Sequence, residues 1–279
     1  MNNSVLIKKY SGEHEAFNIN KLINSLRRSQ TDEDIVQDIA LKIQDEIKEG
    51  MSTKSIYQMA YKMLKQKSKS GSARYKLKNA IMELGPTGYP FERFIGKILE
   101  YEGFKTEVGV VMQGHCITHE VDVAATKEDK HYFIECKFHS SQDRICNVKT
   151  PLYIQSRVKD LEVEWLKNKD HTPKSHKGWI YTNTRFSSDA LQFGECVGLG
   201  MVSWDHPPLQ SLKEKIEQSR LYPITVLASM TKKDKQEVLN KGVVLCREIC
   251  EDPKLLDDIN MTSSKKNRIL KEVIELCEN

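Results

Sequence analysis

The chain has 279 residues, a formal net charge of +4, and 39% hydrophobic against 29% charged residues. This composition excludes collagenous, low-complexity and wholly disordered chains, and no apolar stretch approaches the roughly 20 residues that a bilayer-spanning helix needs. A cytoplasmic protein without membrane association is therefore expected. Its seven cysteines are scattered along the chain and are predicted to be reduced thiols. The length suits two or three domains.

A short hairpin and four helices are predicted for residues 1–87. Apolar residues on both sides of a Ser-Gly turn indicate the hairpin. Thr31 is expected to cap the second helix and Ser52 with Thr53 the third, while residues 67–72 are expected to form a polar loop. The four helices are predicted from apolar residues at helical spacing: Leu22, Ile23 and Leu26; Ile35, Ile39, Ile43 and Ile47; Ile56, Met59, Ala60 and Met63; Ala73, Leu77, Ala80, Ile81 and Leu84.

Residues 88–210 have the pattern of an α/β domain with a mixed sheet. An amphipathic helix through Phe91 and Leu99 comes first and ends at Gly103. Strand-like segments at 108–112, 120–125, 132–138 and 179–182 follow, with helical segments at 152–166 and 187–195. The predicted fold class is thus multidomain α/β, with a mostly helical first domain and this α/β domain in the centre.

A small helical domain is predicted for residues 211–279. Thr231 is expected to cap one of its helices, Gly242 to interrupt the pattern, and residues 243–250 and 269–277 to form two more helices. Lys265, Lys266 and Arg268 precede the last helix; contact with DNA phosphates is one interpretation of these cations, and a solvated helix start is the commoner one.

The chemistry is expected in the central domain, where two alternating segments carry acids and a lysine. Strand side chains point to opposite faces in turn, so Val121 and Val123 are predicted to share a buried face and Glu120 and Asp122 the other. In the next strand, Glu135 and Lys137 share one face by the same rule.

The connecting turn predicts how the two strands pair. If residues 127–130 form a symmetric loop, Thr126 pairs with His131, which places Asp122 across from Glu135. Cross-strand neighbours have Cβ atoms about 4.5–5.5 Å apart, so two such carboxylates call for a cation between them. Hard oxygen ligands suggest Mg²⁺ or Mn²⁺, and Lys137 would orient or deprotonate a water, or neutralise charge on a phosphorane-like transition state. The same spacing also occurs on solvated strand faces without any catalytic role.

The pattern Asp-x12-Glu-x-Lys after an amphipathic helix, with a following helix that contains Gln155 and a Thr182–Ser187 stretch, resembles the Mrr-like restriction endonucleases of the PD-(D/E)xK superfamily. The resemblance covers about residues 88–206. It implies that Asp122 and Glu135 are metal ligands and that Lys137 stands beside the attacking water. It further matches Glu92 to an acidic residue on the preceding helix and Gln155 to the glutamine after the core motif.

Residues 5–86 resemble the ATP-cone, a nucleotide-binding regulatory domain of ribonucleotide reductases. Lys9-Tyr10-Ser11-Gly12 stands where that family usually has Lys-Arg-Asp-Gly, so Tyr10 replaces the family's arginine. The resemblance implies a site for ATP or dATP formed by Lys9, Glu15, Lys21, Thr53 and Arg74. Because there is no Gly-x4-Gly-Lys-Ser/Thr loop, the nucleotide is expected to be an effector rather than a fuel.

The leading prediction is a metal-dependent DNA endonuclease regulated by nucleotide, in defence against foreign DNA. Because each chain would carry one site, cutting two strands favours a dimer or larger homo-oligomer. Two alternatives stay open at this point: a nucleotide-gated module that binds nucleic acid without cleavage, and an RNase.

Overall fold

The computed structural model describes residues 5–9, 12–167 and 175–278. Its internal contacts divide the chain into two compact units. The first combines residues up to Lys78 with Val226–Thr231 and the segment from Ser263, and the second combines Asn79–Thr225 with Lys232–Thr262. The domain boundaries predicted after residues 87 and 210 stay a prediction, and by contact the C-terminal segment is shared between the two units.

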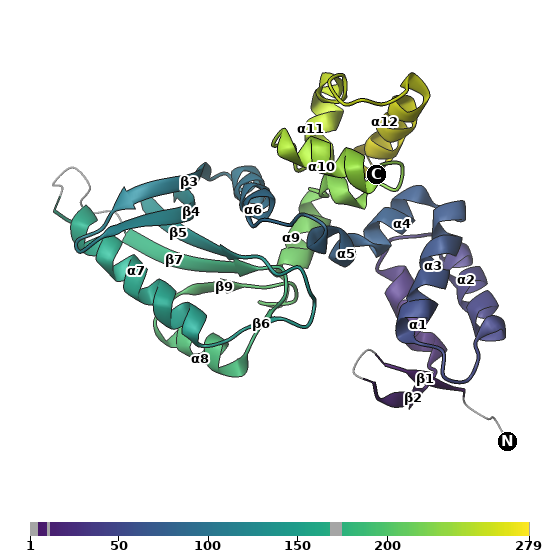
Figure 1. Cartoon of the computed structure of the whole chain (residues 1–279). Coiled ribbons are helices and arrows are strands. Elements are labelled where there is room, and N and C mark those ends of the chain that lie inside the picture. The colour runs from purple at the N-terminus through teal and green to yellow at the C-terminus, as the bar shows by residue number, and fades with distance from the viewer. Residues whose placement is uncertain (1–4, 10–11, 168–174, 279) are drawn as a thin grey trace. The chain divides into compact units, whose positions relative to one another are not determined.

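The first unit joins a two-stranded hairpin to a group of helices (Figure 1). Its elements are β1 (Leu6–Lys8), β2 (His14–Ala16), α1 (Ile19–Arg27), α2 (Glu33–Glu46), α3 (Thr53–Lys67), α4 (Lys69–Tyr75) and α12 (Ser263–Glu278). The stripes predicted for the first three helices form one apolar core, in which Leu26, Ile39 and Leu64 are fully buried. The predicted hairpin and mostly helical character of this region are confirmed.

Two local predictions in this unit are wrong. The N-cap of α2 is Asp32 rather than Thr31, whose hydroxyl lies 2.8 Å from that of Ser29. Residues 67–72 do not form a loop, because Ser68 ends α3 in an extended conformation and its hydroxyl at once accepts a hydrogen bond from Gly71 N. One serine thus separates two helices.

The second unit is built on a five-stranded mixed sheet in the order β3-β4-β5-β7-β9. The strands are β3 (Lys105–Gln113), β4 (Thr118–Lys127), β5 (Lys130–Lys137), β7 (Ser175–Thr182) and β9 (Gly200–Val202). The first three pair antiparallel and the last three pair parallel, as the sequence predicts for a mixed sheet.

Helices cover both faces of this sheet. On one face α6 (Tyr89–Tyr101) approaches so closely that a Cβ at Gly96 would lie 3.0 Å from Val108 Cγ2. On the other face α7 (Lys149–Trp165) and α8 (Ser188–Cys196) bury Ile154, Val158 and Ala190 in a common cluster with Phe133. Figure 1 shows α7 lying along the sheet.

Short elements complete the second unit: α5 (Leu77–Met82), β6 (Ile145–Cys146) paired in parallel with β8 (Arg185–Phe186), α9 (Leu212–Ser219), α10 (Lys232–Asn240) and α11 (Cys246–Glu251). The fourth predicted helix, over residues 73–84, is interrupted at Lys76, which separates α4 from α5. The predicted helix over 243–250 begins only at Cys246, because Leu245 pairs with Pro223 as an isolated bridge and is held extended.

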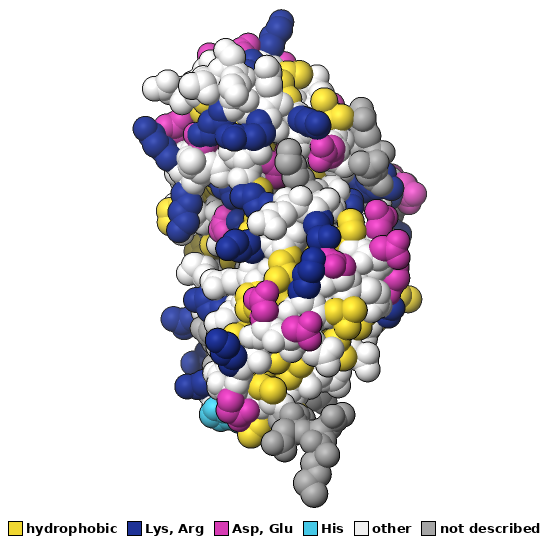
Figure 2. All heavy atoms as spheres, turned by 90° about the vertical axis from the view of Figure 1, so that its right-hand side faces the viewer, with side chains coloured by type: hydrophobic (Ala, Val, Ile, Leu, Met, Phe, Trp, Pro, Cys, Tyr) yellow, Lys and Arg dark blue, Asp and Glu magenta, His cyan; other side chains and the backbone are white. Residues whose placement is uncertain are grey.

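In the view of Figure 2, several Lys and Arg side chains lie side by side in the upper part, and acidic and neutral side chains lie among the others. Within the described part of the chain, no helix is both long and apolar enough to cross a membrane.

Candidate active site

The β4–β5 hairpin has the predicted register. Thr126 pairs with His131, and the ladder continues to Val123 paired with Ile134. One further step in the same register sets Asp122 opposite Glu135, where the ladder ends. The turn is therefore the symmetric one that the sequence predicts, and the two carboxylates lie at the end of the paired region.

The strand alternation breaks at Asp122, so the prediction that Val121 and Val123 share a face is wrong. Val121 belongs to the apolar cluster with α7, whereas Val123 Cγ1 lies 4.0 Å from the position of a Cβ at Gly96 on α6. On β3, Gly109 stands between the residues that pair with these two valines and has a φ of 69°, outside the β region. A residue in this conformation interrupts the pleat, and glycine adopts it without strain.

At this break, the side chain of Asp122 contacts the backbone of β5. Its Oδ2 accepts a hydrogen bond of 2.6 Å from the backbone N of Cys136, the residue between the two other members of the predicted trio. The contact ties Asp122 to the segment that carries Glu135 and Lys137. The structure thus brings all three side chains together at one end of the hairpin.

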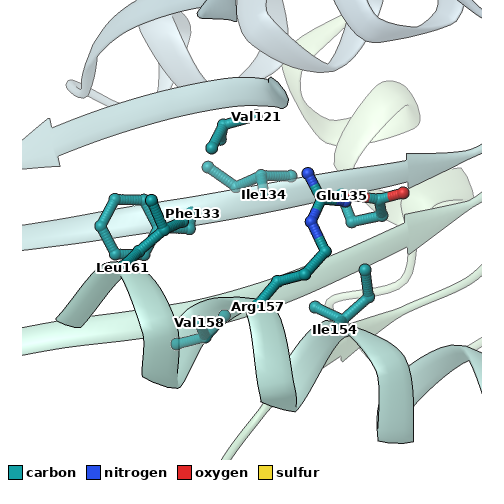
Figure 3. Close-up of a pocket in the computed structure, with 8 residues that line it drawn as sticks. All are labelled: Val121, Phe133, Ile134, Glu135, Ile154, Arg157, Val158 and Leu161. Carbon is teal, nitrogen blue, oxygen red and sulfur yellow. Dashed lines mark hydrogen bonds and ion pairs between the residues drawn. The ribbon is translucent and has the colours of Figure 1, made fainter. Parts of the chain in front are cut away.

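Glu135 lies between two cations. Lys137 Nζ contacts its Oε1, and Arg157 Nη1 on α7 donates to its Oε2 at 2.5 Å. Figure 3 shows Arg157 extending from α7 toward Glu135, with apolar side chains such as Ile154 and Val158 beside it. Glu135 is only 7% exposed, so this pairing offsets the cost of burying its charge.

Two further carboxyl groups of the site have raised pKa values. Burial, followed by the charges of Asp122, Glu120 and Glu135, raises the pKa of Glu92 to about 7. Burial and the charge of Glu135 raise the pKa of Asp122 to about 6. Glu92, in the first turn of α6, is therefore close enough to the trio for their charges to affect it, and its catalytic role stays a prediction.

Lys137 is held as a cation. Burial by itself would lower the pKa of Lys137, but its contact with Glu135 outweighs this effect, and the pKa is raised. An ammonium group in this state does not accept a proton at neutral pH. It fits a role in charge neutralisation and water orientation better than the role of a general base.

Gln155 makes no contact with the trio among the contacts seen in the described residues, and it is partly exposed on α7. Arg157, two residues further, makes the contact instead, and also donates to the Glu120 carbonyl oxygen through Nη2. The sequence held a signal for it: Arg157 lies at helical spacing among Ile154, Val158 and Leu161. A charged residue on an apolar helix face calls for a buried partner of opposite charge.

The donors at this site fit a hard divalent cation. Asp122 and Glu92 carry raised pKa values because they are buried near other carboxylates, and an added cation would relieve this excess of negative charge. Nowhere in the described residues do three His, Cys, Asp or Glu side chains form a metal-binding group. The fit therefore rests on the carboxylates of the two predicted ligands, Asp122 and Glu135, and two carboxylates are a usual number for Mg²⁺ with water as the remaining ligands.

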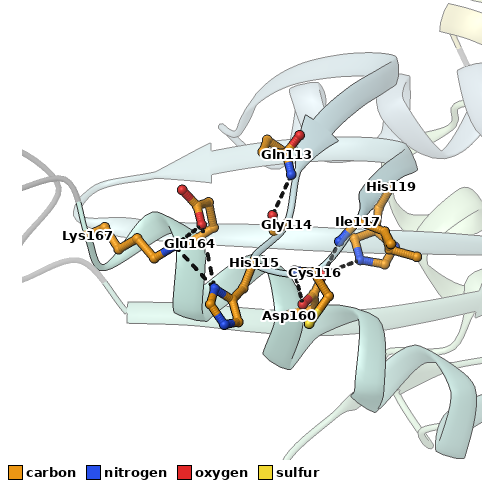
Figure 4. A network of polar contacts seen from close by, with 9 residues as sticks. All are labelled: Gln113, Gly114, His115, Cys116, Ile117, His119, Asp160, Glu164 and Lys167. Atoms are coloured by element: carbon orange, nitrogen blue, oxygen red, sulfur yellow. Dashed lines mark hydrogen bonds and ion pairs between the residues drawn. The ribbon is translucent and has the colours of Figure 1, made fainter.

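A second polar cluster of the same unit has a structural role. Asp160 on α7 accepts hydrogen bonds from Cys116 N at 2.8 Å and Ile117 N at 3.4 Å, and its Oδ2 lies 2.8 Å from His119 Nε2. Figure 4 shows these contacts, together with that of Lys167 to His115. They join the β3–β4 turn to α7.

In the first unit, the structure brings three of the five predicted nucleotide-site residues together. Lys9 and Lys21 contact the same oxygen of Glu15, at 3.0 and 3.1 Å. Lys8 pairs with Ser52, so β1 lies beside the start of α3, where Thr53 is the first helical residue.

Arg74, the remaining member of that predicted site, has other partners. The guanidinium of Arg74 is bonded to Ser29 O at 2.8 Å and to Ser70 Oγ at 3.3 Å. Tyr10, which replaces the arginine of the ATP-cone pattern, and Ser11 lie outside the described residues.

Comparison with known proteins agrees with the nuclease-like geometry. Residues 86–212 match a family described as "Restriction endonuclease", and residues 222–277 match one described as "AF1548-like, C-terminal". The chain thus carries an Mrr-type restriction endonuclease domain, which confirms the predicted resemblance for this segment.

An uncharacterized protein from Archaeoglobus fulgidus is 32% identical over 179 residues, which are 64% of this chain and 97% of that protein. The crystal structure of a protein of unknown function, AF1548, aligns with a TM-score of 0.57 at 29% identity, over 69% of this chain and 99% of that one. The chain belongs to the same family as the Archaeoglobus fulgidus protein.

Proposed function

We propose that the chain is a metal-dependent endonuclease that hydrolyses phosphodiester bonds of DNA, with Asp122, Glu135 and Lys137 at its centre. The observation that supports this proposal is the meeting of these three side chains where the β4–β5 ladder ends, inside a restriction endonuclease-type domain. Glu135 lies between Lys137 and Arg157, an arrangement that a solvated strand face does not need.

In this proposal Asp122 and Glu135 hold Mg²⁺ or Mn²⁺. When bound, the ion supplies Lewis acidity toward the phosphate. Lys137 faces the reacting phosphate as a cation and stabilises the negative charge that develops on it. Glu92, with a pKa of about 7, can hold or release a proton near neutral pH. Arg157 keeps the Glu135 carboxylate in place, and the role proposed for Gln155 stays a prediction.

The first 87 residues are proposed to act as an ATP-cone that binds ATP or dATP and regulates the nuclease. The joint contact of Lys9 and Lys21 with Glu15 supports this, because it brings two cations together in a hairpin whose strand β1 pairs with the start of α3. A triphosphate would compete with Glu15 for both amines. A defence role against foreign DNA, and assembly into a homo-oligomer that cuts both strands, complete the proposal.

Plasmid cleavage with Mg²⁺ or Mn²⁺ tests the nuclease. We expect Asp122→Asn, Glu135→Gln and Lys137→Ala to reduce the rate by about 10²–10⁴-fold, the range for loss of a group that acts in the transition state. Glu107→Gln is the matched control, since Glu107 is an exposed acid on the neighbouring strand β3, and it should stay within about twofold of the native rate. Equal cleavage by the native chain and all four variants would contradict the assignment of the active site.

A second readout does not depend on activity. Mg²⁺ should raise the Tm of the native chain, because a ligand that binds only the folded state stabilises it, and this shift should disappear in Asp122→Asn. Parallel digestion of DNA and RNA distinguishes a DNase from an RNase. Titration with ATP and dATP should change the rate in the native chain but not in Lys21→Ala.

A further inference from the structure

A pocket of about 460 Å³ lies within the first unit, and none of the five residues of the proposed nucleotide site lines it. It is formed by three separate stretches of the chain: Lys65 near the end of α3, the segment 228–231, and the first half of α12. At a rise of 1.5 Å per residue, Lys65 is roughly 18 Å along α3 from Thr53. The pocket is therefore a second site rather than an extension of the first.

One wall of the pocket is fixed by a buried acid. Glu272 on α12 is fully buried, and its carboxylate accepts hydrogen bonds from Ala228 N at 2.6 Å and Ser229 N at 2.9 Å. Both of its oxygens are thus engaged by the backbone of the segment that they hold. The negative charge of Glu272 is therefore used to hold the segment 228–231 in place, and this segment forms one side of the pocket.

The other charged side chains of the lining are cations: Lys65, Lys265 and Arg268. Lys65 and Arg268 are exposed, and Lys265 is partly buried. These residues are about 200 positions apart in the sequence, and only the fold gathers them. Glu272 is the sole acidic residue of the described lining, so the lining carries more positive than negative charge.

We propose that this pocket binds a phosphate-bearing ligand. Its volume is in the range of small-molecule sites, and a guanidinium fork with two ammonium groups matches the several oxygens of a phosphate chain. The phosphates of a free nucleotide and those of a DNA strand have this chemistry in common. Two of the three cations, Lys265 and Arg268, belong to the group that the sequence analysis interpreted as a solvated helix start.

The test measures binding by the full-length chain in a Lys21→Ala background, so that the proposed hairpin site does not contribute. Tripolyphosphate and ATP are titrated by calorimetry, and a short DNA duplex is titrated by fluorescence anisotropy. In this background Arg268→Ala and Lys65→Ala should each raise the Kd about tenfold, the worth of one charge-assisted hydrogen bond. Lys271→Ala, which removes an exposed cation of α12 outside the pocket, is the matched control and should leave the Kd unchanged.

Weaker binding of tripolyphosphate and ATP in the two pocket variants supports a free nucleotide as the ligand, and weaker binding of the duplex alone supports DNA. Equal Kd values for all probes in Arg268→Ala, Lys65→Ala and Lys271→Ala would overturn the proposal, as would the absence of binding in the Lys21→Ala background. Unchanged Tm values show that the variants are folded. Plasmid cleavage does not enter this test, so failure of the pocket and failure of the nuclease are distinguishable.

Discussion

Asp122 is a residue at which function and stability oppose each other. Its pKa is raised from 3.8 to about 6, first by burial and then by Glu135, so the folded state favours the protonated form. The free energy of unfolding therefore falls as the pH rises from about 4 to about 6, because the carboxyl must ionise in an unfavourable place.

Asp122→Asn should consequently stabilise the metal-free chain. The amide oxygen can still accept from Cys136 N, while the charge is gone, so we expect a Tm a few degrees higher at pH 7.5 in EDTA. The difference from the native chain should shrink at pH 4, where the aspartate is protonated. Differential scanning calorimetry at both pH values checks this, and a lower Tm for the variant at pH 7.5 would contradict it.

Arg157 and Glu135 form a largely buried pair whose members should not be removed singly. Arg157→Met leaves Glu135 with Lys137 alone, and the free energy of unfolding should fall by about 3 kcal/mol, as for other broken buried pairs. The double variant Glu135→Gln with Arg157→Met should recover most of this loss, because no unpaired charge stays buried. Cleavage should be lost in both.

Urea unfolding measures these free energies. Arg185→Met, which removes an exposed arginine of the same unit, should change the free energy of unfolding by less than about 0.5 kcal/mol. If the double variant proves less stable than Arg157→Met, the loss of stability in Arg157→Met does not come from an unpaired charge on Glu135.

At the scale of elements, one aspartate connects the β3–β4 turn to α7. Asp160 serves two backbone N–H groups of the turn and the ring of His119, and these bonds hold the pKa of Asp160 below its ordinary value. Asp160→Ala leaves the N–H groups of Cys116 and Ile117 without this acceptor. Their hydrogen exchange should become about tenfold faster, since the turn opens more often.

Hydrogen exchange with mass spectrometry or NMR detects this change. Glu162→Gln on the same helix is the control and should leave exchange in the turn unchanged. Exchange that accelerates equally throughout β5 would show a global loss of stability rather than a local opening.

At the scale of the whole molecule, the last helix belongs to the first compact unit. Ile269, Val273 and Leu276 on α12 are fully buried, α12 contacts α4, and Glu272 holds the segment 228–231. A chain that ends at residue 262 loses all of these contacts, and each apolar side chain is worth about 1.5–3 kcal/mol of burial. We expect faster hydrogen exchange in α4 of this truncated chain and native exchange in β4 and β5.

A chain that lacks only residues 278 and 279 is the matched control. Native protection of α4 in the truncated chain would mean that the first unit is complete without its C-terminal helix.

The sequence by itself determined the mixed sheet, most helices, the hairpin register through Thr126 and His131, and the trio of Asp122, Glu135 and Lys137. These features depend on apolar periodicity and on a short turn, which are local properties of the chain. The pairing of Arg157 with Glu135, the reversal of faces at Asp122 and the pocket between α3 and α12 depended on tertiary structure. Each results from contacts between residues far apart in sequence or from a glycine conformation on a neighbouring strand. The apolar stripe of α7 indicates that Arg157 needs a buried partner, but no local pattern shows which residue that partner is.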